Sequence, residues 1–189
     1  MKAILAAFLA AFLAATAALP AIARWPDSRG TSIPEGSIEA LAVAKAMREH
    51  VWLYPAVEIV HIVGFVILVG AVVMFDLRVL GLSKQVSVRA LARHLLPWSV
   101  AALLLILPSG LAMFSAHASE LLTNRAFQVK MALILAAGIN AGIFHTGPYQ
   151  AVAAWDTQVA APIGARISVA LSIVIWLSII ACGRLLAYV

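Results

Sequence analysis

The stretch VWLYPAVEIVHIVGFVILVGAVVMF (residues 51–75) decides the fold class, because it is long and apolar enough to cross a bilayer as one helix. Pro55, Glu58 and His61 are the interruptions of its apolar character. Three further apolar runs follow, at residues 95–114, 131–144 and 167–186. The third run is short, so we expect residues 127–130 and His145 to complete that span. The sequence therefore predicts an all-α, integral membrane four-helix bundle.

The composition of the 189-residue chain agrees, since 64% of its residues are hydrophobic and only 11% are charged. Soluble domains are less apolar and carry about twice that share of charge, and disordered chains are more polar still. The net charge of +5 is spread along the chain without a dense basic block, so we expect no nucleic-acid partner. The expected partners are the lipid bilayer and either another membrane protein or a second copy.

Residues 1–23 have the features of a secretory signal peptide: Lys2, an apolar stretch at 3–18, and the A-x-A pattern at 21–23. The alternative is an uncleaved first membrane helix. Residues 24–50 are predicted to form an extracytoplasmic linker and a short amphipathic surface helix that begins at Ser37 and runs to His50. Residues 51–189 would form the transmembrane domain, with the mature N-terminus outside and a positively charged loop over residues 76–94 inside.

Ionisable residues inside apolar runs are the functional clue, because a charge at the bilayer centre costs at least about 2.5–3.5 kcal/mol. Helix rise places His61 about 21 Å above the inner boundary and Glu58 one turn further out. Two levels of polar groups are expected. The outer level comprises Glu58, His61, His117, Lys130 and Arg184, and the inner level comprises Asp76, Arg78, His94, His145, Asp156 and Arg166.

These residues have three interpretations. In the first they are structural, and Glu58 pairs with Lys130 or Arg184. In the second, His61 is an axial ligand of a b-type haem, since helical bundles hold haem through histidines on facing helices. His117 would be its partner, although helix rise separates the two by about 9 Å. His94 and His145 would form a second site. Cationic partners for the haem propionates would come from Lys130 and Arg184.

In the third interpretation, Glu58 and His61 form an intramembrane site that handles copper or protons. The chain has no G-x-S-x-G, P-loop or H-E-x-x-H motif, so an enzyme is not expected. Its single cysteine, Cys182, lies in an apolar run and predicts a small buried hydrophobe. We therefore expect a non-catalytic membrane subunit or anchor, with a haem-based redox link as the specific hypothesis and copper or proton transport as the alternative.

The longest runs that carry a family resemblance are LYPAVEIVHIVGFVILVGAVVMFDLRVLGL (53–82) and ARISVALSIVIWLSIIACGRLLAY (165–188). With the shorter runs LLPWSV (95–100), AFQVK (126–130) and INAGIFH (139–145), the chain resembles an uncharacterised family of small bacterial inner-membrane proteins. That family is loosely similar to copper-resistance inner-membrane proteins. The resemblance implies four membrane spans and a place in the bacterial inner membrane, and it assigns no activity.

Overall fold

The computed structural model describes residues 37–186 and 188, and every regular element within them is a helix. The predicted signal peptide lies outside these residues. In chain order the helices are η1 (Ile38–Ala40), α2 (Ala42–Glu49), α3 (Leu53–Leu80), α4 (Val88–Ala116), α5 (Ala118–Thr123), α6 (Arg125–Thr146), η2 (Pro148–Ala154) and α7 (Ile163–Leu185).

Four of the helices, α3, α4, α6 and α7, are long and apolar enough to cross a membrane. They contain 28, 29, 22 and 23 residues, against the roughly 20 that a crossing requires. Helix α6 includes Lys130 and His145, so the third apolar run is completed at both ends as predicted. Among the described residues the chain therefore has the four spans of a multi-pass membrane protein, and the prediction of an all-helical bundle is confirmed.

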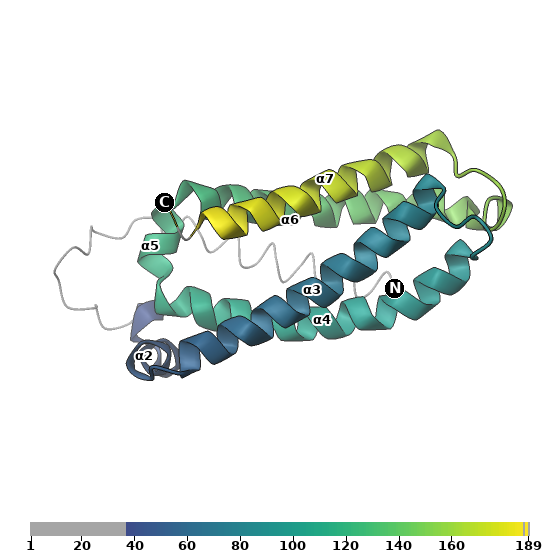
Figure 1. The fold of residues 1–189 in the computed structure, drawn as a ribbon. Helices are drawn as coiled ribbons and strands as arrows, with labels where there is room; N and C mark the ends of the chain where they lie inside the picture. Colours follow the sequence, from purple (N-terminus) through teal and green to yellow (C-terminus); the bar gives the residue numbers. More distant parts are fainter. Residues whose placement is uncertain (1–36, 187, 189) are drawn as a thin grey trace.

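The four spans form two hairpins, α3 with α4 and α6 with α7, that meet where α3 packs on α7 (Figure 1). Gly64 allows the close approach inside the first hairpin. A Cβ atom at this position would lie 2.9 Å from Ile106 Cγ1 and 3.2 Å from the backbone oxygen of Ala102. We refer to the end of the bundle that carries α2 and α5 as the α2 end, and to the opposite end as the η2 end.

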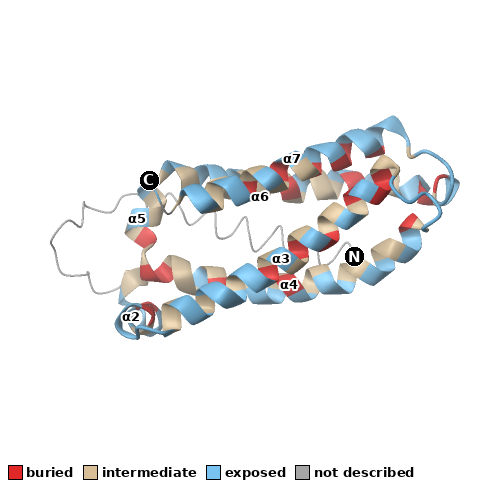
Figure 2. Cartoon of the chain, in the orientation of Figure 1, coloured by how far each residue is buried: buried red, intermediate tan, exposed pale blue. Residues whose placement is uncertain are grey.

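Buried residues occur along the length of the bundle, with a cluster at the η2 end, and many of the exposed positions (pale blue in Figure 2) carry large apolar side chains. A cluster at that end draws on all the spans and on η2; it comprises Val79, Val88, Phe144, Val152, Trp155, Ala165 and Val169. In lipid an exposed apolar surface carries no penalty, because acyl chains are as apolar as leucine. The exposed apolar faces therefore fit a bundle whose solvent is the bilayer.

The predicted loop over residues 76–94 is wrong in extent, because both flanking helices continue into it. The connection is limited to residues 81–87. Gly81 ends α3 in the left-handed conformation, with φ at +119°, and Ser87 begins α4 by accepting a hydrogen bond from Ala90 N at 3.0 Å. These local capping signals, and not the change from apolar to charged residues, determine where the helices end.

The predicted surface helix also differs, because it is broken at Leu41. Ser37 caps the short helix η1, and Leu41 then adopts an extended conformation before α2 begins. Helix α2 buries Ala44 and Met47 completely or nearly so and contacts α4. It is therefore packed onto the α2 end of the bundle.

Candidate functional site

His61 lies on α3, half-buried, with its imidazole turned toward α4. Its Nδ1 atom is 3.0 Å from the hydroxyl oxygen of Ser109. Gly110 provides the space for the ring, since a Cβ atom there would lie 3.0 Å from His61 Cε1. Neither of these two neighbours was predicted from the sequence to belong to the site. The run Pro108-Ser109-Gly110 could have indicated them, because a small polar residue and a glycine stand next to a proline inside an apolar helix.

The hydrogen bonds of Ser109 favour one of the two neutral tautomers of His61. The Ser109 hydroxyl donates to the backbone oxygen of Leu105 at 2.5 Å, with Ile106 O at 3.2 Å. A hydroxyl has a single hydrogen, so when it is donated to Leu105 O the same oxygen accepts from His61 Nδ1. In that tautomer the lone pair lies on Nε2, the atom that can bind a metal or accept a proton.

Lys130, on α6, is a half-buried cation. It lies within electrostatic range of the His61 imidazole and of the Cys182 thiol. Its ammonium would lie 3.7 Å from a Cβ atom at Gly183 of α7. Within the part of the chain that the structure describes, Lys130 has no anionic partner. All four spans thus contribute to one polar centre, defined here as the His61 centre: His61, Ser109, Lys130 and Cys182.

The other groups predicted at the outer level do not join the His61 centre. Glu58 is exposed and forms no ion pair with a described residue. Arg184 is exposed; its guanidinium hydrogen-bonds the Tyr188 hydroxyl and lies 4.8 Å from the centroid of that ring. The structural interpretation, in which Glu58 pairs with Lys130 or Arg184, therefore has no support in the described contacts.

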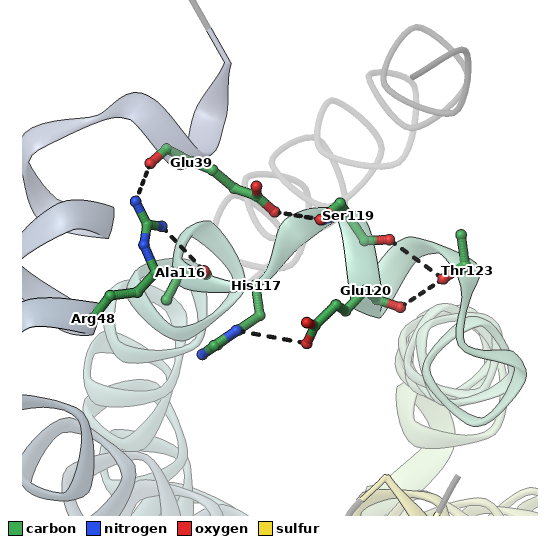
Figure 3. A network of polar contacts seen from close by, with 7 residues as sticks. All are labelled: Glu39, Arg48, Ala116, His117, Ser119, Glu120 and Thr123. Carbon is green, nitrogen blue, oxygen red and sulfur yellow. Dashed lines mark hydrogen bonds and ion pairs between the residues drawn. The ribbon is translucent and has the colours of Figure 1, made fainter. Parts of the chain in front are cut away.

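His117 belongs to a separate polar network at the α2 end (Figure 3). Its Nδ1 lies 3.6 Å from a carboxylate oxygen of Glu120, and its ring packs edge-on against Tyr54 at 5.7 Å. Tyr54 is seven residues before His61 on α3, which corresponds to about 10 Å along the helix. The depth difference expected between His117 and His61 thus persists in the fold.

The same network fastens η1 and α2 to the bundle (Figure 3). The Arg48 guanidinium donates to the backbone oxygens of Ala116, at 3.1 Å, and Glu39, at 2.6 Å. The Glu39 carboxylate accepts from the backbone N–H and the hydroxyl of Ser119, at 2.8 and 2.7 Å. These bonds satisfy free backbone groups at the α4–α5 junction, so the network is a structural cap.

The two inner histidines are not brought into contact by the described interactions. His94 is exposed on α4 and has no hydrogen bond or ion pair with a described residue. His145 packs against Tyr149 and Phe144, with ring centroids at 5.1 and 5.5 Å, and its Nδ1 atom is buried without a hydrogen bond. Nothing in these contacts favours a second haem site between the two.

A family model described as a family of unknown function (DUF6644) matches residues 50–189. The chain belongs to this family. The match covers all four spans and begins just after α2, so the DUF6644 region is the membrane bundle itself. No curated protein and no solved structure is significantly similar to the chain.

Asp156 holds the loops of this DUF6644 bundle together at the η2 end. Its carboxylate accepts from the Ser87 hydroxyl at 2.8 and 3.0 Å and from Arg89 N at 2.8 Å. Burial opposes ionisation, but these bonds and the charges of Arg89 and Arg78 prevail and lower the pKa of Asp156 below its usual value. Asp156 was predicted at the inner level, and its role there is to cap α4.

The described residues contain no group of three or more His, Cys, Asp or Glu side chains that could hold a metal ion. A bare ion at His61 would therefore have to complete its coordination from other sources. The His61 centre offers one imidazole nitrogen and one cation, which suits a ligand that brings its own metal ligands and its own negative charge.

Proposed function

We propose that the chain is a non-catalytic membrane subunit that carries a redox-active b-type haem on His61. The observation that supports this most directly is the orientation of the imidazole. The 2.5 Å bond from the Ser109 hydroxyl to Leu105 O favours donation from His61 Nδ1 to Ser109, and this tautomer leaves the Nε2 lone pair for an axial bond. Histidine ligands of metals are generally held in this way, with the second ring nitrogen donating to a neighbouring oxygen.

Haem also suits the ligand count at this site. Porphyrin supplies four equatorial nitrogens, so one protein side chain is enough to hold the iron. Copper, by contrast, would need several ligands from the protein, and the described residues offer no such group near His61.

Lys130 provides the second supporting observation. A lysine inside a bundle without a described anionic partner is costly in hydrocarbon, and a propionate would remove this cost. Arg184 was the other candidate for this role, but it is exposed and its guanidinium donates a hydrogen bond to the Tyr188 hydroxyl. Lys130 is therefore the residue that we assign to the propionates, and the bound haem would supply one-electron chemistry.

Copper or proton handling at Glu58 and His61 is the second candidate function. The loose similarity to copper-resistance proteins favours it. The exposure of Glu58 weighs against it, because no described contact brings the Glu58 carboxylate to the His61 ring, which is turned toward α4. Under the first proposal, the haem-carrying subunit would lie in the bacterial inner membrane with its N-terminus outside, and it would exchange electrons with another membrane protein.

The test is the reduced-minus-oxidised absorption spectrum of the protein purified in mild detergent from cells supplied with haem precursors. We expect a haem α-band that is lost in His61→Ala and retained in His94→Ala, a matched change at an exposed histidine of α4. An α-band of equal size in His61→Ala would contradict the assignment of the ligand. A bare spectrum in the wild type would exclude haem, and altered copper tolerance of a deletion strain would then favour the second candidate.

A further inference from the structure

Asp76, on α3, is a buried carboxyl group that the His61 centre does not use. Asp76 is 4% exposed, and no other Asp or Glu among the described residues is buried. It lies fifteen residues after His61, about 22 Å further along the helix toward the η2 end. The two positions are therefore separate sites.

Among the described residues, the second of the two Asp76 carboxyl oxygens has no hydrogen-bond partner. The hydroxyl of Ser172, itself buried on α7, donates a hydrogen bond to the Asp76 carboxyl. The second oxygen, Oδ2, is buried and has no hydrogen-bond partner in the structure. No ion pair joins Asp76 to a described cation.

No charged group at this end of the bundle forms an ion pair with Asp76 in the described contacts. Arg78, two residues further on α3, donates to the backbone oxygens of Val86, Lys84 and Asp156 at 2.5, 3.0 and 2.9 Å. The other ionisable groups on the elements around this end are Lys84 of the α3–α4 connection, Arg89, Arg93 and His94 of α4, His145 of α6, Tyr149 of η2, Asp156 of the following loop, and Arg166 of α7. His145 presents a buried Nδ1 atom without a partner, and Arg166 is exposed.

Ser172 belongs to a line of buried and half-buried polar groups that crosses the bundle. Ser168, one turn away on the same face of α7, donates to Asn140 Oδ1 at 2.9 Å, and Asn140 Nδ2 donates to Ser168 O at 2.9 Å. The line thus runs from Asp76 on α3 through the two serines of α7 to Asn140 on α6. Buried polar groups in spans of this kind mark sites where ions or protons bind.

We propose that Asp76 is an intramembrane proton-binding site. A hydronium ion gives its proton to Oδ2 and is left as water, so that the carboxylate becomes a neutral carboxyl group while the other oxygen keeps its hydrogen bond from Ser172. No electron is transferred. A proton is the favoured ligand because one carboxylate and one hydroxyl provide too few oxygens for Ca²⁺ or Mg²⁺, which need six or more ligands.

The test is infrared difference spectroscopy of the full chain in detergent, between acidic and alkaline pH. We expect the C=O stretch of a protonated carboxyl group at neutral pH in the wild type and in Glu120→Gln, the control at an exposed acid. The band should be absent in Asp76→Asn. Ser172→Ala should retain the band at a shifted frequency, because the hydrogen bond to the carboxyl group is lost.

If Asp76→Asn fails to assemble, Ser172→Ala still tests the proposal. An unshifted carboxyl band in Ser172→Ala would overturn it. Absence of the band in the wild type would overturn it as well. A carboxylate band that changes when Na⁺ is exchanged for choline would show a sodium site instead. None of these outcomes depends on haem, so this proposal and the one for His61 fail independently.

Discussion

The substitution Ser109→Ala tests the geometry of the His61 centre. It removes two interactions, the bond to Leu105 O at 2.5 Å and the contact with His61 Nδ1 at 3.0 Å. Side-chain hydrogen bonds in membrane proteins contribute about 0.6 kcal/mol on average and at most about 1.7. We therefore expect Ser109→Ala to lower the free energy of unfolding by about 1–2 kcal/mol.

Ser99→Ala is the matched control on the same helix. The hydroxyl of Ser99 bonds to Leu95 O at 3.1 Å, which is the same local bond without a histidine, so a loss of about 0.5 kcal/mol is expected. Reversible unfolding in mixed micelles measures both changes. A double-mutant cycle with His61→Ala should then give a coupling free energy of about 0.6–1.7 kcal/mol between His61 and Ser109.

Two results would refute this reasoning. The first is a Ser109→Ala variant that is no less stable than Ser99→Ala, and the second is a coupling free energy of zero. Either would mean that the imidazole is not held by Ser109 in the bilayer. The same variant should lower haem affinity by about 10- to 100-fold if the serine orients an axial ligand.

Three further predictions concern charged groups. Lys130→Met should leave the haem-free protein as stable or make it more stable, because an unpaired cation leaves the interior, while haem affinity falls; a clear loss of stability without haem would contradict this. Arg78→Ala should cost at least about 3 kcal/mol in unfolding experiments, because it removes three charge-assisted bonds, whereas Arg166→Ala, at an exposed site, should change little. Asp156→Ala should cost about 1–2 kcal/mol at neutral pH through loss of the α4 cap. The pKa of Asp156 is lowered by folding, so its stabilisation is present above the unfolded-state pKa and is lost as the pH falls through the folded-state pKa. Stability measured against pH should therefore show the wild type and Asp156→Ala converging in acid, and a constant difference would refute the role of the carboxylate.

Much of the fold could be predicted from hydropathy, because each span is a long apolar segment and its length is set by the bilayer. Even Lys130 was placed correctly at the start of the third span. The helix ends were predicted less well. Asp76 and Arg78 were assigned to a loop because they are charged, but Gly81 and Ser87 are the residues that end and begin the helices.

The membership of the site was harder to predict for a physical reason. The spans are apolar on nearly all sides, so the sequence gives no face that must point inward, and the rotation of each helix is set by packing. Glu58 and His61 share a side of α3 at i and i+3, yet only His61 reaches α4. Ser109 was missed because it is a single hydroxyl in an otherwise apolar span, and Asp76 was placed among the inner polar groups without a role of its own.

The division of the bundle into two hairpins has a consequence for its biogenesis. Each hairpin is closed by its own connection at the η2 end, and the two are joined there by Arg78, which reaches from α3 to the backbone of Asp156 in the second hairpin. Insertion by the translocon can therefore deliver two helix pairs in succession, with docking as a later step inside the lipid. The hydrogen bond from Arg78 to Asp156 O can form only once both helix pairs are in place, so it stabilises the docked state of the two hairpins.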